Sequence, residues 1–233
     1  MNTHTLPIIG QHHSPLSQKF GIPRQPNLVA IKSHITFYPP FDNPDAFVGI
    51  DNYSHLWVLW HFHHNKVQDD FRPQVRPPRL GGNKKLGVFA TRSMYRPSNM
   101  GLSVVAFDKV EIVDNKLMLH IMGADMADGT PILDIKPYLA FADGVGNALS
   151  FDKPTVRIAK FSEQAEHDFY HLKNLHLNQN DKQLISDLIA QDPRVAYRQD
   201  EINTISTMRY KSVDVDFVMN EQGVMVIQAL REI

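Results

Sequence analysis

The clearest indication of the fold lies in residues 103–122, SVVAFDKVEIVDNKLMLHIM. Apolar side chains recur among polar neighbours in its first half, at Val104, Ala106, Val110 and Ile112. This largely alternating pattern is typical of a strand with one buried face. Asp114-Asn115 follows as a pair of residues that suits a hairpin turn. The stretch therefore predicts two antiparallel strands, 103–113 and 116–122, joined as a hairpin.

The chain before this hairpin also favours β-structure. Four more apolar runs, separated by Gly- and Pro-containing turns, predict strands at 8–12, 28–37, 54–62 and 86–92. Short strands with such turns indicate a barrel or a sandwich rather than alternating βαβ units.

The pattern changes after Asp152-Lys153-Pro154. Apolar residues fall at helical spacing in two runs, Phe161 to Leu172 and Leu184 to Ile189, and Asn180 or Asp181 is placed to cap the second helix. Three strand-like runs follow, at 204–210, 213–219 and 224–230. We therefore expect a mainly β chain with a smaller α+β part: a β domain over residues 1–150 and a small α+β domain over 151–233.

Composition narrows the class of protein. The chain has 233 residues, of which 42% are hydrophobic and 21% charged, as in ordinary globular proteins. It contains no cysteine, which excludes disulfides, thiolate metal sites and a cysteine nucleophile. The first residues do not resemble a signal peptide, and no apolar run approaches the ~20 residues that span a bilayer. We expect a cytoplasmic protein that binds no membrane.

The net charge is only −1, but the charges are unevenly distributed. No Asp or Glu occurs between Phe71 and Phe107, although the chain holds 25 of them. The basic residues of that segment are Arg72, Arg76, Arg79, Lys84, Lys85, Arg92 and Arg96. Such a segment indicates a surface for a polyanion, with a solvated basic loop as the alternative.

Nucleotide-binding signatures are absent. The glycines of Gly81-Gly82-Asn83-Lys84-Lys85-Leu86-Gly87 have the wrong spacing for a dinucleotide-binding turn, and no Walker motif occurs. His61 and His63 lie two apart on a predicted strand and therefore on one face, where they could bind a metal ion. Ordinary packing or contact with a cofactor is the alternative for this pair. His167 and His171 mimic a zinc-binding helix, but a surface helix face explains them without a metal ion.

Two other clusters could carry chemistry. One spans residues 91–101 and contains Arg92 and Arg96, whose guanidinium groups can hold a carboxylate or a phosphate. The other contains Asp125 and Asp128, and carboxylates in a tight turn could bind ribose hydroxyls or an amino group. Ordinary turns are the alternative for both clusters.

Several motifs resemble the TrmO family of tRNA adenine N6-methyltransferases. They are Pro23-Arg24-Gln25-Pro26, Ser54-His55-Leu56-Trp57, Arg76-Pro77-Pro78-Arg79-Leu80-Gly81-Gly82, Gly87-Val88-Phe89-Ala90-Thr91-Arg92-Ser93, Asp128-Gly129-Thr130-Pro131 and Asp134-Ile135-Lys136-Pro137-Tyr138. The resemblance runs from about Ile9 to Phe141 and continues weakly to residues 192–198. Enzymes of this family methylate threonylcarbamoyl-adenosine at position 37, beside the anticodon of threonine tRNA.

The resemblance implies an antiparallel β-barrel methyltransferase domain that uses S-adenosylmethionine, in a homodimer. It implies cofactor contacts at Pro23, Arg24, Gln25, His63, His64, Arg92, Leu102, Asp125, Met126, Ala127 and Asp128. One departure is clear: the family commonly reads Arg-Pro-Asn-Pro-Ile-Gly where this chain has Arg96-Pro97-Ser98-Asn99-Met100-Gly101.

Methylation of a nitrogen requires a group that accepts its proton, and Asp128, His63 and His64 are the candidates. For RNA binding, we expect phosphate contacts from Arg72, Arg76, Arg79, Lys84 and Lys85, and stacking on a base by Tyr95. A packed core position is the alternative for Tyr95. The partner is then the anticodon loop of a threonine tRNA, and not DNA. Two other functions remain open: a metal-dependent hydrolase that uses His61 and His63, and a non-catalytic RNA-binding module.

Overall fold

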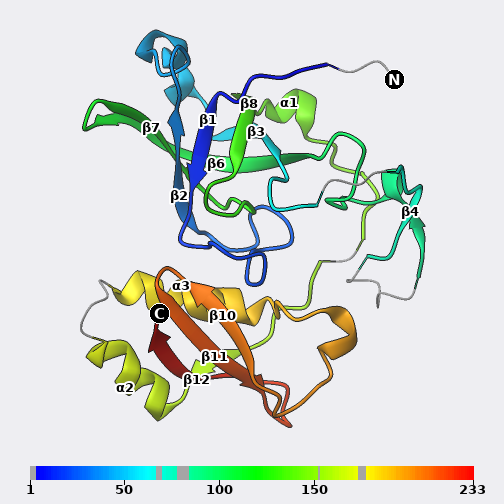
Figure 1. Cartoon of the computed structure of the whole chain (residues 1–233), viewed down its shortest axis with the longest axis vertical. Helices are drawn as coiled ribbons and strands as arrows, with labels where there is room; N and C mark the ends of the chain where they lie inside the picture. The colour runs from blue at the N-terminus through cyan, green and yellow to red at the C-terminus, as the bar shows by residue number, and fades with distance from the viewer. Residues whose placement is uncertain (1–3, 67–69, 78–83, 152, 173–176) are drawn as a thin grey trace. The chain divides into compact units, whose positions relative to one another are not determined.

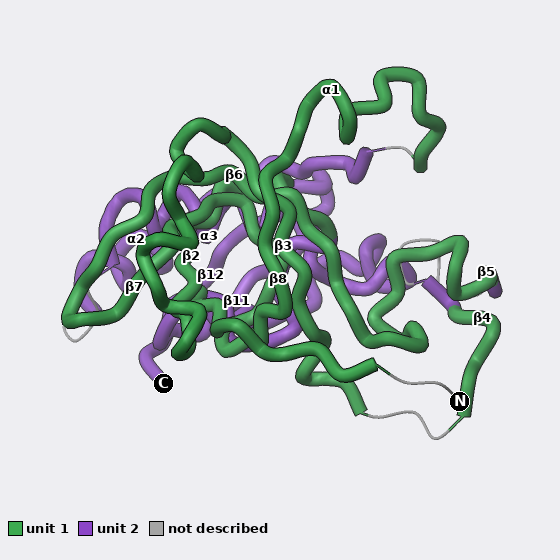
Figure 2. The backbone as a smooth tube through the Cα atoms, turned by 90° about the horizontal axis from the view of Figure 1, so that it is seen from above, with its two compact units in different colours: residues 1–14, 25–75, 86–151 green, residues 15–24, 76–85, 152–233 purple. Residues whose placement is uncertain are grey.

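The computed structural model describes residues 4–66, 70–77, 84–151, 153–172 and 177–233 (Figure 1). The chain folds into two compact units. Unit 1 comprises residues 1–14, 25–75 and 86–151, and unit 2 comprises 15–24, 76–85 and 152–233 (Figure 2). The chain therefore passes between the units several times, and one of these crossings lies between Arg24 and Gln25.

Unit 1 is built on a closed barrel of six strands in the order β1-β2-β7-β6-β3-β8. All pairs in this ring are antiparallel. The strands are β1 (Gly10–His13), β2 (Lys32–Phe37), β3 (His55–His61), β6 (Met100–Val113), β7 (Lys116–Met122) and β8 (Pro131–Pro137). A two-stranded ribbon of β4 (Gln74–Val75) and β5 (Leu86–Gly87) lies outside the ring.

The predicted hairpin is confirmed as β6 and β7, in which Val113 pairs with Lys116. Asp114 and Asn115 form the turn, with φ angles of 50° and 59°. Positive φ at both central residues matches the right-handed twist of the strands, and Asp and Asn adopt it more readily than most residues do.

The buried face of β6 changes along the strand. Residues that pair across a hairpin share a face. Val110 and Ile112 pair with the buried Leu119 and Leu117, although Ile112 itself is 60% exposed. Val105 is buried, however, which places the neighbouring Val104 on the opposite face. A bulge between Phe107 and Lys109 shifts the register by one residue, so a single alternation could not describe the whole strand.

Apolar side chains fill the barrel interior, as the alternation of inward and outward residues requires. The fully buried members of this core are Ile35, Leu56, Val58, Val105, Leu119 and Ile132. His12 is also fully buried, so β1 contributes an imidazole to the interior.

Unit 2 contains a four-stranded sheet in the order β10-β11-β12-β9, in which only β9 and β12 are parallel. Helices α2 and α3 pack against β9 and β12. The elements are β9 (Ala159–Phe161), α2 (Glu163–His171), α3 (Gln179–Ala190), β10 (Ser206–Tyr210), β11 (Val213–Met219) and β12 (Met225–Glu232).

The start of α3 differs from expectation. Asn178 is the N-cap, and its side chain accepts hydrogen bonds from the backbone N–H groups of Asn180 and Asp181. Asp181 returns a hydrogen bond to the backbone of Asn178, which completes a capping box. The predicted cap at Asn180 or Asp181 is therefore wrong by two or three residues.

The prediction of a mainly β chain with a smaller α+β part is confirmed, with local corrections. Residues 86–92 do not form one strand: β5 ends at Gly87, and the 3-10 helix η4 (Val88–Ala90) follows. Strands β8 and β9 were not expected, because the first follows turn-rich sequence and the second has only three residues.

The remaining elements are short. They are α1 (Ala140–Asp143) and the 3-10 helices η1 (Pro44–Phe47), η2 (Ile50–Asn52) and η5 (Ala196–Arg198). Within the described ranges, no helix is long and apolar enough to cross a membrane.

Candidate cofactor site

The candidate site contains a chain of hydrogen bonds that ends at a half-buried carboxylate, Asp125. The indole Nε1 of Trp60 donates to the Ser103 Oγ at 3.0 Å, and the Ser103 hydroxyl donates to the Asp125 Oδ1 at 2.5 Å. Gly101 makes room for this arrangement, because a Cβ there would lie 2.2 Å from the Trp60 ring. The barrel core thus fixes the direction of the Asp125 carboxyl group.

The pKa of Asp125 is unusually high for an aspartate. Burial raises the pKa of Asp125 from 3.8 to about 6, although the Ser103 hydroxyl, its own backbone N–H and the positive charge of Arg92 favour the ionised form. A cationic ligand would stabilise the ionised form of this carboxyl group, because added positive charge offsets the loss of hydration. Perturbed carboxyl groups of this kind are frequent at functional sites.

Arg92 connects the 91–101 cluster to the Pro23-Arg24-Gln25 motif. Its Nη1 donates to the Gln25 Oε1 at 2.6 Å, and its charge acts on Asp125. Two residues further along, the Asn27 N–H donates to the carbonyl oxygen of Gly123 at 2.8 Å, and the Asn27 Nδ2 donates to that of Val104 at 2.9 Å. The structure therefore brings Gln25, Arg92 and Asp125 together in unit 1.

Asp128 lies in a turn that β1 holds in place. Its Oδ1 accepts the Ser14 N–H at 2.9 Å, and the Gly129 N–H donates to the His12 carbonyl oxygen at 2.9 Å. Gly129 has a φ of 76°, a conformation that favours glycine. The turn is therefore ordered by backbone contacts that leave Asp128 exposed.

Inside the barrel, His12 supports the same turn. Its Nδ1 donates to the Ala127 carbonyl oxygen at 3.0 Å, and burial lowers its pKa to about 4, so the ring is neutral at pH 7. Met126 and Ala127 are only 1% and 7% exposed. Their side chains belong to the core, so a cofactor could reach these two residues only through their backbone.

The His63 and His64 rings lie 3.9 Å apart, centroid to centroid, just after β3. A Cβ built on Gly129 would lie 3.8 Å from the His63 Nε2, so His63 neighbours the turn that carries Asp128. For the alternative of a metal enzyme at His61 and His63, the described residues contain no group of three or more His, Asp or Glu that could hold a metal ion.

Leu102 is 51% exposed on the outer face of β6, directly after Gly101 and before Ser103. The turn before it contains Asn99, where the motif that the chain resembles has proline. Asn99 has a φ of 48°, and its N–H donates to the Arg96 carbonyl oxygen at 3.0 Å. Proline cannot adopt a positive φ and has no backbone N–H to donate, so a proline at position 99 could not form this turn.

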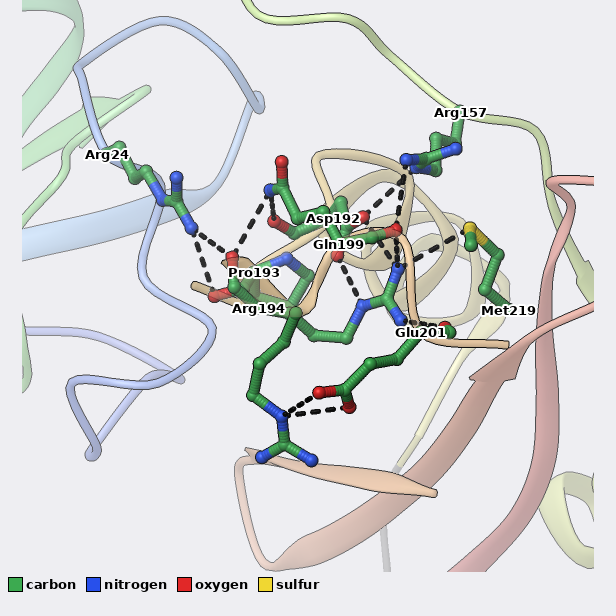
Figure 3. Close-up of polar contacts among 9 residues, drawn as sticks. Arg24, Arg157, Asp192, Pro193, Arg194, Gln199, Glu201 and Met219 are labelled. Carbon is green, nitrogen blue, oxygen red and sulfur yellow. Dashed lines mark hydrogen bonds and ion pairs between the residues drawn. The ribbon is translucent and has the colours of Figure 1, made fainter. Parts of the chain in front are cut away.

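Two predicted cofactor residues lie in unit 2. Pro23 is buried, and the exposed Arg24 donates from Nη2 to the carbonyl oxygens of Pro193, at 3.3 Å, and Arg194 (Figure 3). The motif Pro23-Arg24-Gln25 therefore begins in one unit and ends in the other.

Among the predicted RNA-binding residues, Arg72, Arg76, Lys84 and Lys85 are exposed, and Arg79 lies outside the described residues. Tyr95 is 45% exposed, so the alternative of a packed core tyrosine is wrong.

Sequence reasoning missed Trp60, Ser103, Asn27 and His12 as supports of the site. One signal was present for Ser103, which is a hydroxyl residue at an inward position of an apolar strand. A buried hydroxyl needs a partner, and here that partner is Asp125.

Comparison with known proteins follows the same two-part division. The family profile of the tRNA-methyltransferase O N-terminal domain matches residues 11–144, and that of the TrmO C-terminal domain matches residues 155–232. Both matches define the class of the protein as a tRNA methyltransferase. The chain belongs to the TrmO family.

Individual relatives support the same family assignment. The chain is 39% identical over 209 residues to the tRNA (adenine(37)-N6)-methyltransferase of Escherichia coli (strain K12), with 86% of each protein covered. It is 42% identical over 217 residues, 91% of each protein, to a Pseudomonas aeruginosa protein with the provisional name S-adenosylmethionine-dependent methyltransferase RcsF. The crystal structure of TrmO from Pseudomonas aeruginosa superimposes with a TM-score of 0.79 and 32% identity, over 99% of this chain and 100% of that one.

Proposed function

We propose that this chain methylates the N6 nitrogen of threonylcarbamoyl-adenosine at position 37 of threonine tRNA. The observation that carries the proposal is the match of both TrmO domains, over residues 11–144 and 155–232. The chain is an S-adenosylmethionine-dependent tRNA (adenine-N6)-methyltransferase. The threonylcarbamoyl group and the threonine tRNA are supported by the resemblance of its motifs to those of the family.

The residues of the candidate site fit S-adenosylmethionine. This cofactor carries a carboxylate, an ammonium and a sulfonium group, together with an adenosine. Arg92 can hold a carboxylate, and the raised pKa of Asp125 makes its ionised form a good partner for a positive charge. Leu102, 51% exposed, offers an apolar contact.

When bound, S-adenosylmethionine supplies the methyl group, and its sulfur keeps the electron pair of the broken S–C bond. The N6 nitrogen of the substrate is conjugated to a carbonyl and is a poor nucleophile, so it must lose its proton as the new N–C bond forms. We assign the proton acceptor to Asp128, His63 or His64. His63 neighbours the turn that carries Asp128, which supports one shared location for these groups.

The phosphate contacts belong, in this proposal, to the basic segment that flanks β4 and β5. Its described members Arg72, Arg76, Lys84 and Lys85 are exposed, and none of the ion pairs among the described residues includes them. Basic side chains elsewhere in unit 2 differ, because carboxylates already neutralise many of them: Lys182 by Glu166, Arg198 by Glu201, Arg209 by Asp214, Lys211 by Asp181 and Arg231 by Asp216. The exposed Tyr95 would stack on a base.

The assignment of parts is also a proposal. Residues 1–150 would bind the cofactor, in an antiparallel β-barrel methyltransferase domain, and residues 151–233 would help to bind tRNA. The resemblance supports a homodimer that acts on the anticodon loop, and a tRNA substrate supports a cytoplasmic location.

The test is methyl transfer from labelled S-adenosylmethionine by the purified full chain. Threonine tRNA that carries the threonylcarbamoyl group should be labelled, and the same tRNA without this group should not. Equal labelling of both would contradict the proposed substrate. No labelling of any tRNA, with folded protein, would contradict the activity itself.

A further inference from the structure

A dense set of polar contacts surrounds Asp192 in unit 2 (Figure 3). Asp192 and Arg194 are only 3% and 4% exposed. The Asp192 carboxylate accepts two hydrogen bonds from Arg194, from Nε at 2.7 Å and from Nη2 at 2.8 Å, and a third from the Arg157 Nε at 3.0 Å. A buried pair of this kind is a poor source of stability, but it fixes the geometry of the loop that carries it.

Gln199 completes this arrangement. Its Nε2 donates to the carbonyl oxygens of Asp192, at 3.1 Å, and Arg194, at 3.2 Å. The backbone carbonyl oxygen of Gln199 accepts hydrogen bonds from the Arg194 Nη2 at 3.0 Å and from the Arg157 Nη2 at 3.3 Å. These hydrogen bonds therefore connect the two ends of the loop from Asp192 to Gln199.

The ordered loop presents carbonyl groups to one side chain from a distant part of the sequence, Arg24. The Arg24 Nη2 donates to the carbonyl oxygens of Pro193 and Arg194 (Figure 3). The Arg194 carbonyl thus accepts from both Arg24 and Gln199. Arg24 is the last residue of its unit 2 segment, and the next residue, Gln25, belongs to unit 1 and contacts Arg92.

We propose that the Asp192–Gln199 loop is a positioning element for the cofactor-binding motif. It holds the Arg24 side chain, and the peptide bond from Arg24 to Gln25 passes this restraint to Gln25 and its partner Arg92. Asp192, Arg194 and Gln199 are then positioning residues for S-adenosylmethionine binding, although the sequence places them far from the motif. This inference rests on the proposed function, because it requires that the motif binds the cofactor.

A double-mutant cycle on the full chain tests this inference. The affinity for S-adenosylmethionine is measured by calorimetry for the wild type, Arg24→Ala, Gln199→Ala and the double variant. We expect Gln199→Ala to weaken binding about 3- to 10-fold, as for the loss of one or two neutral hydrogen bonds. The double variant should bind no more weakly than Arg24→Ala alone, because the two residues act through one contact.

Steady-state kinetics separates positioning from general damage. The KM for S-adenosylmethionine should rise in Gln199→Ala while kcat at saturating cofactor stays the same. Arg198→Ala is the matched control, since Arg198 lies in the same loop and its side chain pairs with the exposed side chain of Glu201. If thermal unfolding shows that Gln199→Ala is not folded, Gln199→Asn replaces it, because the shorter amide cannot span the two carbonyls.

Fully additive effects in the cycle, or wild-type affinity in the Gln199 variant, would overturn the inference while leaving the proposed function intact. A folded wild-type chain that binds no S-adenosylmethionine would overturn both, so the two failures can be told apart.

Discussion

Asp125→Asn should stabilise the chain at neutral pH while it weakens cofactor binding. Burial raises the pKa of Asp125 from 3.8 to about 6, so the folded chain holds its proton more tightly than the unfolded chain. Asparagine has nearly the same shape and cannot ionise. The Ser103 hydroxyl, 2.5 Å from the Asp125 Oδ1, can still donate to the amide oxygen that replaces it.

The size of the effect follows from the two pKa values. Stability that the wild type has below pH 4 is lost as the pH rises through about 6, since the folded chain must then ionise a half-buried group. The shift of about two units corresponds to roughly 3 kcal/mol as an upper bound, at about 1.4 kcal/mol per unit. Above pH 7 the variant should therefore be more stable than the wild type, by up to this amount.

Denaturant unfolding between pH 4 and 8 measures this difference. The free energy of unfolding of Asp125→Asn should exceed that of the wild type only slightly near pH 4, and this difference should grow until about pH 7. Asp51→Asn is the control, because it replaces an exposed acid and should give no such pH-dependent gap. At pH 7.5, S-adenosylmethionine should bind the Asp125 variant about 10- to 100-fold more weakly, as for the loss of a charged hydrogen-bond partner.

A gap between the two unfolding free energies that does not change with pH would refute this account of Asp125. A variant less stable than the wild type at pH 8 would refute it as well. If stability rises as expected but cofactor affinity is unchanged, burial destabilises the ionised form of Asp125, but Asp125 does not contact the cofactor.

Three other predictions concern separate parts of the chain. Lys84→Ala with Lys85→Ala should weaken tRNA binding and lower the log–log salt slope by roughly 0.7–0.9 for each phosphate that is no longer neutralised, with cofactor affinity unchanged. Arg92→Ala should weaken S-adenosylmethionine binding by roughly 1.5–3 kcal/mol in calorimetry, because it removes both the charge and the hydrogen bond to Gln25. Removal of residues 152–233 should weaken cofactor binding, because Arg24 then has no carbonyl groups of Pro193 and Arg194 to bind.

Each of these predictions has its own control or contrary result. Lys116→Ala with Lys153→Ala removes two exposed lysines from outside the basic segment, and should leave the salt slope nearly unchanged. Wild-type affinity in folded Arg92→Ala would exclude a direct contact with the cofactor. A soluble truncated chain with full cofactor affinity would show that Arg24 needs no support from residues 152–233.

Local sequence patterns predicted much of the fold. Asp114-Asn115 between two apolar runs specifies a hairpin because the turn needs two positive φ angles. The bulge after Phe107 could not be predicted, because it depends on pairing with β7 rather than on local preference. Strand β8 was missed because it follows turn-rich sequence, and its pairing with β1 and β3 is what identifies it as a strand.

The candidate site was predictable as a set of motif residues, but their supports were not. The family motifs pointed to Gln25, Arg92 and Asp125, which the structure does bring together. Pairs such as Trp60 with Ser103, or Arg24 with Arg194, join residues far apart in the chain, and no local pattern marks them. Such contacts arise only when the elements that carry them have folded.

Mass spectrometry of tRNA nucleosides, from cells with and without the gene for this chain, tests the central claim most directly. The account predicts that the N6-methylated form of threonylcarbamoyl-adenosine disappears without the gene, while the unmethylated form accumulates. The wild-type gene should restore the methylated form, and the Arg92→Ala variant should restore less of it. Equal amounts of the methylated nucleoside in both cell types would contradict the claim.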